Sequence, residues 1–417
     1  MLTVLPVYQA QEQILHSMAG VTTSAMLAAA ADSLGKVVAE QVVSPEKVPS
    51  YARSTMDGFA VRSEDTFGAT DSLPSLLLLK GKISMGVEPE HKLGSWEAME
   101  ISTGGMLPEG SDSVVMLEYC EVMGDQVAVC QPTAPLENII SAGEDYNQGD
   151  EVLVPGHKIR AQDLGILAAL GITGVRVYSP PRVVIFSTGD EVVSPDQSPN
   201  PGQIRDVNGP TLSALVRETG GIPDYRGIIP DSHEALEEGL LQVLDNCDLV
   251  LVSGGSSVGT RDVTARVMDQ LPGNGVLFHG VSMRPGKPLI YGVGQGKPVF
   301  GLSGNPVSAI FGFLLFVRPL LRQLQGLQAF PAYLPYVEAC LDTNFASQGG
   351  REDYVRVMLD DFVHQDKETA FNDLPGAKPV FGGPGLLNPV VKGDGYFVIP
   401  RDVEGLDKGS RVKVFLW

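Results

Sequence analysis

Apolar runs alternate with helix-like runs between residues 181 and 326, and this alternation limits the possible folds more than any other feature. Four of the runs predict strands, at residues 182–191, 223–231, 247–255 and 298–304. Four others predict helices, at residues 208–221, 232–246, 259–271 and 305–324. Continuous apolar strands separated by helices are typical of a parallel sheet with both faces covered. We therefore expect a parallel-sheet α/β domain over residues 181–326.

The regions on either side of this domain follow a different pattern. Residues 8–31 predict one or two helices, interrupted at Gly20. Residues 51–145 and 336–417 contain short alternating runs separated by glycine and proline, which indicate β-rich structure. A chain of 417 residues is expected to form two to four domains. We divide it into residues 1–180, 181–326 and 327–417, with a linker at 326–335.

Composition argues against several functional classes. The formal charge of −20 argues against a nucleic-acid surface, because contact with many phosphates needs a basic patch. The four cysteines form no CxxC pair, which favours buried thiols in a reducing cytoplasm. Residues 1–30 lack the pattern of a signal peptide, and the strongest apolar run, 309–317, is about half the length that spans a bilayer. We expect a soluble cytoplasmic protein without membrane contact.

Three predicted strands end in loops rich in glycine and small polar residues, at 186–191, 252–262 and 301–308. In an open parallel sheet, ligands bind beyond the carboxyl ends of the strands. Loops without bulky side chains that lead into helices expose backbone N–H groups to an anion. One such loop is an ordinary turn, but three at one edge predict a phosphate-binding site. The candidate binding residues are Ser187, Thr188, Gly189, Gly254, Gly255, Ser257, Ser303, Gly304, Asn305 and Ser308.

Four carboxylates lie at or just beyond the ends of the same strands and loops, namely Asp190, Glu191, Asp231 and Asp262. Acidic groups that face a phosphate need a divalent cation between them, so these residues are candidate metal ligands. The alternative is that they cap the N-termini of helices, which is common for aspartate at such positions. Capping is the stronger alternative for Asp231, which precedes a predicted helix.

A basic turn at residues 280–288 offers two cations, Arg284 and Lys287, held by Pro285 and Gly286. It is not a Walker A loop, because the glycine spacing is one residue too long and proline follows the lysine. The two side chains could meet a phosphate or another oxyanion. The alternative is that they are solvated surface charges.

Two further turns lie in the N-terminal half of the chain. Residues 53–62 place Asp57 before a glycine, and residues 100–112 contain Thr103 before a pair of glycines. Both turns combine hydroxyl or carboxylate groups with a flexible backbone. Each alone is also compatible with an ordinary turn.

Taken together, the chain resembles the MoeA family of molybdopterin molybdenumtransferases, to which the gephyrin E domain also belongs. The resemblance runs from about residue 8 to the C-terminus and rests on motifs in the same order: STMDGFAV, ISTGGMLPEGSDSVV, AGEDY, VVIFSTGDE, GIIPDS, VSGGSSVG, RPGKP and GLSGNPVSA. It implies an elongated homodimer with a β-rich domain, a small extended domain, a MogA-like α/β domain and a C-terminal β-barrel-like domain. It further implies that adenylylated molybdopterin and molybdate, with a divalent cation such as Mg²⁺, yield molybdenum cofactor and AMP.

The resemblance also assigns roles to residues. Asp57 and Thr103 match motifs that reach the active site across the dimer. Glu191, Asp231 and Asp262 match acidic positions that serve metal binding and turnover. The glycine-rich loops match contacts to the nucleotide and to the pterin phosphate.

The basic turn matches the place of a phosphate or of the incoming molybdate, and it also contains a departure from the family. Arginine at 284 stands where lysine is usual; the charge is kept, but arginine demands a planar, bidentate partner. The other departures are Arg53, Val263 and Ser303, where asparagine, an aromatic residue and proline are more usual. These departures leave the choice between molybdate and tungstate open.

Two other functions remain as alternatives. A MogA-type molybdopterin adenylyltransferase needs an α/β domain of this kind, although the flanking regions with Asp57 and Thr103 favour the molybdenumtransferase. A non-catalytic dimeric scaffold, as in the gephyrin E domain, is disfavoured by the acidic residues that the chain keeps. Expected partners are a second copy of the chain, a molybdopterin adenylyltransferase and proteins that mature molybdoenzymes.

Overall fold

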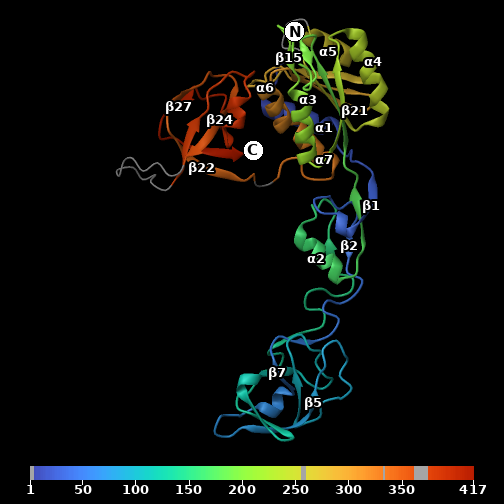
Figure 1. Cartoon of the computed structure of the whole chain (residues 1–417), viewed down its shortest axis with the longest axis vertical. Coiled ribbons are helices and arrows are strands. Elements are labelled where there is room, and N and C mark those ends of the chain that lie inside the picture. Colours follow the sequence, from blue (N-terminus) through green and yellow to red (C-terminus); the bar gives the residue numbers. More distant parts are fainter. Residues whose placement is uncertain (1–3, 255–259, 332–333, 361–373) are drawn as a thin grey trace.

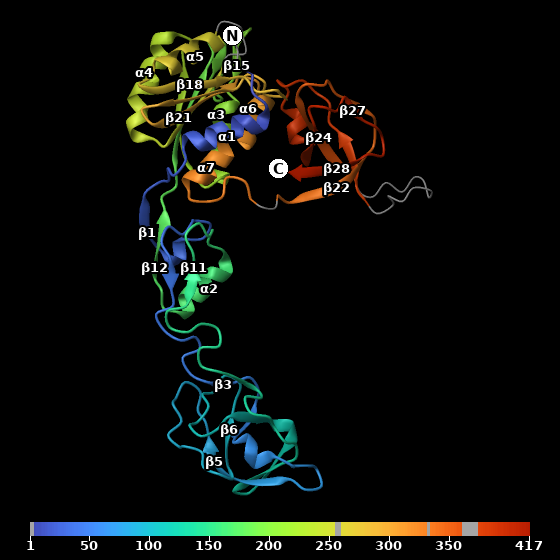
Figure 2. The ribbon, with the colours of Figure 1, turned by 180° about the vertical axis from the view of Figure 1, so that it is seen from behind.

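The structure, a computed structural model, describes residues 4–254, 260–331, 334–360 and 374–417, with only the backbone of residues 260–262. Figures 1 and 2 show an elongated molecule. Two lobes lie side by side at one end, a narrow ribbon of strands runs away from them, and a third lobe lies at the far end. The chain passes down the ribbon, builds the far lobe, returns through the ribbon and ends in the lobe beside the α/β domain.

The α/β domain is built on a sheet of six strands. Their order is Ile222–Ile229 (β16), Arg182–Thr188 (β13), Leu249–Gly254 (β17), Lys297–Ser303 (β21), Ile290–Gly294 (β20) and Gly273–His279 (β18). The first four strands are parallel, which confirms the predicted parallel sheet. The last two are antiparallel additions that the sequence pattern did not predict. Glycines interrupt both of them, and the two-residue turn before β21 forces an antiparallel hairpin.

Helices cover both faces of this sheet, because alternate residues of its buried strands point to opposite sides. Val183 and Ile185 of β13 pack in one core, and Val184 and Phe186 pack in the other. The first core is covered by Val7–Ser17 (α1), Asn208–Glu218 (α3), Pro306–Gly312 (α6) and Arg318–Leu324 (α7). The second core is covered by His233–Val243 (α4) and Thr260–Gln270 (α5).

Helix α1 therefore contributes to the α/β core although it lies at the start of the chain, within the range 1–180 that we assigned to the N-terminal region. The stretch Pro306–Leu324 lies in the same core. Within it, a π-helical segment, Phe313–Val317, joins α6 to α7. Among the described residues, it is the one helical stretch long and apolar enough to cross a membrane, but 78% of it is buried inside the domain. It is therefore best described as a core helix.

Three strand pairs form the ribbon. They are Ala25–Ala29 (β1) with Gly174–Tyr178 (β12), Val42–Val43 (β2) with Glu151–Leu153 (β11), and Arg53–Ser54 (β3) with Ile139–Ile140 (β10). Helix Ala161–Ala169 (α2) packs beside the middle pair. The prediction of a second helix before residue 31 was wrong, because all five residues of β1 pair with β12 and this pairing overrides the helix propensity of alanine.

The far lobe confirms the predicted β-rich region. Its six-stranded sheet has the order Ser113–Met116 (β7), Gly58–Val61 (β4), Glu97–Ile101 (β6), Ser75–Lys82 (β5), Gln126–Val129 (β9) and Cys120–Met123 (β8). Two small apolar cores lie against this sheet, one containing Phe59 and Val115 and the other Met99 and Val114.

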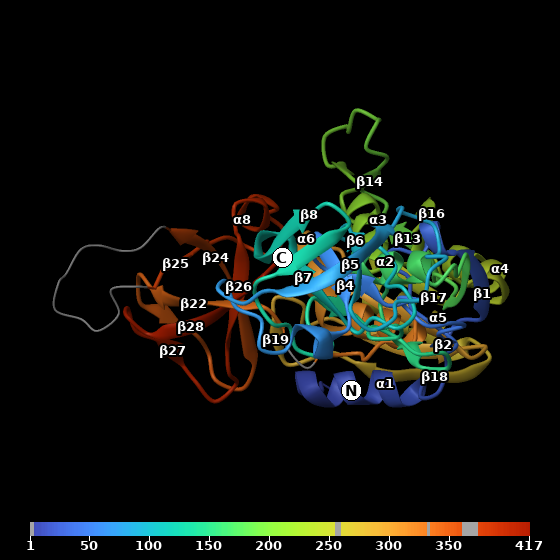
Figure 3. The same cartoon turned by 90° about the horizontal axis from the view of Figure 1, so that it is seen from below.

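The C-terminal lobe is a closed barrel, as predicted. Its ring consists of Glu352–Asp360 (β24), Gly376–Pro379 (β25), Tyr336–Leu341 (β22), Arg411–Leu416 (β28) and Gly395–Ile399 (β26), and the pairing of β26 with β24 closes it. The short strand Met283–Arg284 (β19), from the basic turn of the α/β domain, pairs in parallel with the start of β24. Figure 3 shows β19 between the two lobes. This pairing fixes the basic turn against the barrel.

Candidate functional site

The three strands that lead into the glycine-rich loops end at one edge of the α/β sheet. Thr188 pairs with Gly254 across β13 and β17, and Gly254 pairs with Ser303 across β17 and β21. The ends of the three strands therefore lie side by side, as the strand order requires. This arrangement brings Ser187, Thr188, Gly254, Ser303 and Gly304 to one edge of the domain.

Gly254 leaves no room for a side chain at this edge. A Cβ atom there would overlap the Thr188 hydroxyl and would stand 2.6 Å from the carbonyl oxygen of Thr188. The close approach of β13 and β17 thus depends on glycine at this position.

A small cavity of about 110 Å³ opens beside these strand ends. Its lining combines backbone with small polar groups, and Glu191 and Arg205 stand among them. Two buried polar residues of the lining, Asp206 and Asn208, were not identified from the sequence. The available signal was the run Asp-Val-Asn-Gly immediately before and at the start of α3, which is typical of a helix N-terminus.

The predicted acidic cluster is only partly brought together. The backbone N–H of Asp231 donates to the Asp190 carboxylate at 3.3 Å. Burial raises the pKa of Asp231, and the neighbouring charges of Asp190 and Glu191 raise it further. Ser232, not Asp231, caps helix α4 by accepting a hydrogen bond from Ala235 N–H. The capping alternative is therefore wrong for Asp231 at this helix.

Within the described part of the chain, no group of three or more His, Cys, Asp or Glu side chains is close enough to hold a metal ion. The side chain of Asp262, and the whole of Gly255 and Ser257, lie outside the described residues. The described carboxylates Asp190, Glu191 and Asp231 therefore do not form a metal site by themselves, although carboxylate oxygens are the ligands that a hard cation prefers.

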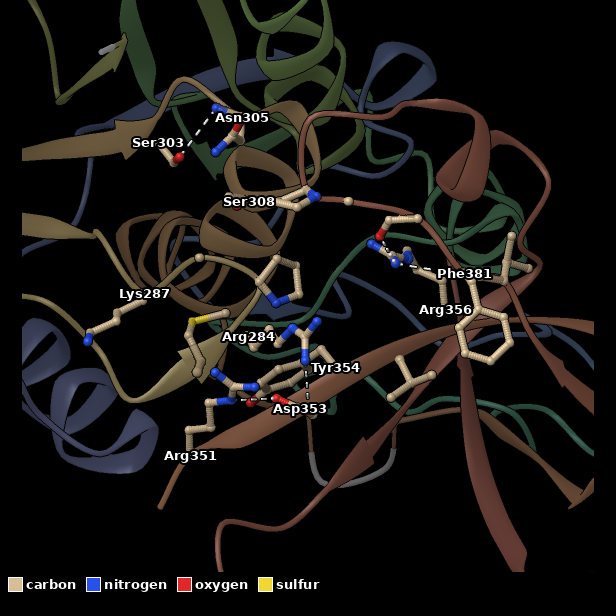
Figure 4. A pocket seen from close by; sticks show the side chains of 18 of the residues that line it. Arg284, Lys287, Ser303, Asn305, Ser308, Arg351, Asp353, Tyr354, Arg356 and Phe381 are labelled. Carbon is tan, nitrogen blue, oxygen red and sulfur yellow. Dashed lines mark hydrogen bonds and ion pairs between the residues drawn. The ribbon is translucent and has the colours of Figure 1, made fainter. Parts of the chain in front are cut away.

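A larger cavity of about 590 Å³ lies between the basic turn and the barrel (Figure 4). Four basic side chains line it, namely Arg284, Lys287, Arg351 and Arg356. One buried carboxylate, Asp353, accepts a hydrogen bond from Arg351 Nε at 3.1 Å and lies 3.9 Å from Arg284 Nη1. Because four basic residues and one acidic residue line the cavity, it is positively charged and suits an anion.

Arg356 is held inside this cavity by backbone oxygen. Its Nη2 donates to the carbonyl oxygen of Gly382 at 3.0 Å, while its buried Nε has no hydrogen-bond partner among the residues that the structure describes. Burial lowers the pKa of Arg356, and the charge of Arg284 lowers it further. The sequence did not point to Arg351, Asp353 or Arg356, because the pairing of β19 with β24 brings them to the basic turn from about seventy residues away.

The two cavities share one loop. Asn305, which follows β21, lines both of them, and Ser303 and Ser308 line the larger one. Asn305 N–H donates to the Ser303 hydroxyl at 3.2 Å, an interaction drawn in Figure 4. A ligand that extends along this loop would therefore contact the sheet edge and the basic cavity together.

Asp57 and Thr103 form a pair in the far lobe. The carboxylate of Asp57 accepts hydrogen bonds from the N–H of Thr103 at 2.7 Å and from its hydroxyl at 3.1 Å. Both hydrogen bonds lower the pKa of Asp57, and the bond from the Thr103 backbone has the larger effect. The pair lies beyond the ribbon, so within one chain it is not part of the site at the sheet edge.

Comparison with known proteins identifies the fold. The model of the MoeA N-terminal region (domain I and II) matches residues 5–171, that of a probable molybdopterin binding domain matches 184–323, and that of the MoeA C-terminal region (domain IV) matches 338–417. The molybdopterin molybdenumtransferase of Haemophilus influenzae is 32% identical over 92% of this chain and 91% of its own. The chain belongs to the MoeA family.

Other MoeA relatives agree with this assignment. The molybdopterin molybdenumtransferase of Nostoc sp. is 36% identical over 77% of this chain and 74% of its own. The crystal structure of the molybdopterin biosynthesis MoeA protein from Pyrococcus horikoshii OT3 superposes with a TM-score of 0.83, at 29% identity, over 100% of both chains. The resemblance inferred from the motifs is thereby confirmed, together with the multidomain fold.

Proposed function

We propose that this chain is an enzyme that inserts molybdenum into adenylylated molybdopterin, giving molybdenum cofactor and AMP. Relatives named molybdopterin molybdenumtransferase support this reaction class. The observation that carries the proposal is the loop at Asn305, which joins a cavity rich in exposed backbone to a basic cavity. A substrate with phosphate groups and a reacting oxyanion needs both surfaces at once.

The residues at the sheet edge bind the phosphates of the substrate in this proposal. Ser187 and Thr188 end β13, Gly189 follows it, and the strand ends at Gly254 and Ser303 lie beside them. In this proposal, backbone N–H groups beyond the strand ends donate hydrogen bonds to phosphate oxygens, while the Ser187 hydroxyl donates to Asp206. The N-termini of the following helices favour the negative charge.

The basic cavity holds the molybdate in this proposal. Arg284, Lys287 and Arg351 supply cationic donors, and Asp353 lies beside both arginines. A guanidinium group presents two parallel N–H donors to an oxyanion, which suits the tetrahedral molybdate ion. Ser308, buried at the start of α6, faces the same cavity.

Asp190, Glu191, Asp231 and Asp262 are the residues that would hold a divalent cation such as Mg²⁺. When bound, such an ion neutralises phosphate charge and polarises the phosphate bond that is cleaved. The hydrogen bond from Asp231 N–H to the Asp190 carboxylate, which places these two residues together, supports this assignment.

A second copy of the chain completes the site in this proposal. Asp57 and Thr103 lie beyond the ribbon, and an antiparallel partner would bring its far lobe to the sheet edge of the first chain. We further propose that the enzyme acts in the cytoplasm, where a molybdopterin adenylyltransferase would supply its substrate and maturation proteins would accept its product.

The first test measures AMP released from adenylylated molybdopterin with Mg²⁺ and molybdate. Molybdate-dependent release by the wild type, lost in Arg284→Ala, supports the proposal. The proposal is overturned if the wild type releases no AMP with molybdate and none with tungstate. Consumption of ATP instead would indicate an adenylyltransferase.

The second test mixes two inactive variants, Asp57→Asn and Arg284→Ala, after dissociation and reassociation. If a site combines residues of two subunits, random mixing restores about a quarter of the wild-type sites. If Asp57 acts only within its own chain, or if the protein is a monomer, no activity returns.

A further inference from the structure

Asp206 and Asn208 lie where the phosphate-binding loops of the α/β domain converge. They follow the short strand Ile204–Arg205 (β15), and Asn208 is the first residue of α3. Both side chains are almost completely buried, with 5% and 6% of their surface exposed. Buried polar groups of this kind are costly unless their hydrogen bonds are made, so their partners matter.

The Asp206 carboxylate binds the neighbouring strands β13 and β16. Its Oδ2 accepts hydrogen bonds from the Ser187 hydroxyl, near the end of β13, at 3.0 Å and from the Tyr225 hydroxyl of β16 at 2.5 Å. Its Oδ1 accepts from the backbone N–H groups of Asn208 and Gly209, both at 3.1 Å. Four donors thus hold this carboxylate in one orientation.

The Asn208 side chain binds the other two parallel strands. Its Nδ2 donates to the Ser253 hydroxyl of β17 at 2.8 Å and to the carbonyl oxygen of Gly304, just after β21, at 3.0 Å. Because a carbonyl oxygen can only accept, the nitrogen must face Gly304, and this fixes the orientation of the amide. Its Oδ1 is buried and has no partner among the described residues.

Backbone pairing does not by itself set the positions of the loops. The ladder between β17 and β21 ends at the pair Gly254 and Ser303, and Gly304 lies beyond it. The residue after Asn208 reinforces the arrangement, because a Cβ at Gly209 would overlap the Asp206 carboxylate and lie 2.6 Å from the Tyr225 ring. The spacing of the loops at the sheet edge therefore depends on the two buried side chains.

We propose that Asp206 and Asn208 are positioning residues that hold the ends of β13 and β17 and the phosphate-binding loop after β21 at the spacing the substrate requires. This inference rests on the proposed function and deepens it. Neither residue needs to touch the reacting atoms, because both act through Ser187, Ser253 and Gly304.

The most informative variant is Asn208→Asp, which keeps the shape of the side chain and removes the NH2 group that donates its hydrogen bonds. Ionised aspartate would turn an oxygen toward the Gly304 carbonyl, whereas protonated aspartate can donate to it. Burial would raise the pKa of the introduced carboxyl group. The charged groups lining the same cavity are Glu191, Arg205 and Asp206, so two carboxylates oppose one guanidinium and raise that pKa further.

We expect Asn208→Asp to bind AMP about tenfold more weakly than the wild type at pH 8 and to recover most of that loss near pH 5.5. Calorimetric titration with AMP alone measures this without any transferase chemistry. AMP release should follow the same pH profile, and the fold decrease in kcat should be larger than the fold change in KM. The matched control is Asn200→Asp, which makes the same change at an exposed site and should bind AMP like the wild type.

Tyr225→Phe tests the other half of the pair if Asn208→Asp does not fold. It removes only the hydroxyl that donates to Asp206, and the ring stays in place. We expect AMP affinity to fall about threefold, with a decrease of about 3 °C in the melting temperature because the buried carboxylate loses one donor.

Wild-type affinity at pH 8 in a folded Asn208→Asp protein, or a loss that does not recover at low pH, would overturn the inference. If the wild type releases no AMP from adenylylated molybdopterin but the AMP titrations behave as expected, the proposed reaction fails and the positioning role stands.

Discussion

Replacing Gly254 with alanine would test how closely β13 and β17 must approach at the site. The added Cβ would overlap the Thr188 hydroxyl, which can rotate away, and would stand 2.6 Å from the Thr188 carbonyl oxygen, which cannot. An ordinary contact begins at 3.4 Å, so the two strand ends would have to separate by about 0.8 Å.

Forcing an extra methyl group into a packed site usually costs about 1–3 kcal/mol. We take the upper end, about 3 kcal/mol, because the clash involves backbone between two central strands that are buried on both faces. For a domain of this size, each kcal/mol lowers the melting temperature by about 3 °C, so we expect a decrease of about 9 °C.

Scanning calorimetry of the full chain, with hydrogen exchange of the β13 and β17 amides, measures this effect. AMP release should fall as well, because the separated loops no longer match the phosphates. The matched control is Gly165→Ala in α2, where no atom lies within 4 Å of the added Cβ and the backbone is helical. That variant should be more stable by about 1 kcal/mol.

A melting temperature within about 2 °C of the wild type for Gly254→Ala, with normal AMP release, would refute the reasoning. It would mean that the strand ends can separate freely and that glycine at this position is not required by packing.

Three further variants test other parts of the molecule. Asp163→Asn should destabilise the region around α2 by about 2 kcal/mol at pH 7, because the buried carboxylate binds the side chain and the N–H of Arg160. Arg160 lowers the pKa of Asp163, so its stabilisation is present above the ordinary value of 3.8, and the difference in urea unfolding from the wild type should shrink as the pH falls below it. Asp57→Asn should abolish AMP release without changing the melting temperature, since its amide oxygen can still accept from Thr103 N–H. Arg351→Ala should raise the KM for molybdate about tenfold and also lower the melting temperature, because the buried Asp353 loses a donor; an unchanged KM would exclude Arg351 from the anion site.

Local patterns in the sequence were enough to predict the parallel strands, the helices between them and the three glycine-rich loops. Continuous apolar runs and helical periodicity are short-range signals, and parallel strands always present their carboxyl ends at one edge. The same signals failed for β1, where five residues follow a helical composition but pair with β12 about 150 residues away. They also failed for β18 and β20, whose glycines conceal the strand pattern.

The sequence by itself therefore determined which residues could bind phosphate at the sheet edge, because those residues are grouped within each loop. Only the tertiary structure decided how the strand ends are held, since Asp206 and Asn208 reach partners from three strands and from the loop after β21. It also decided the charge of the larger cavity, where the pairing of β19 with β24 brings Arg351 and Asp353 to Arg284. Contacts of this kind depend on the packing of distant segments, and no local pattern records them.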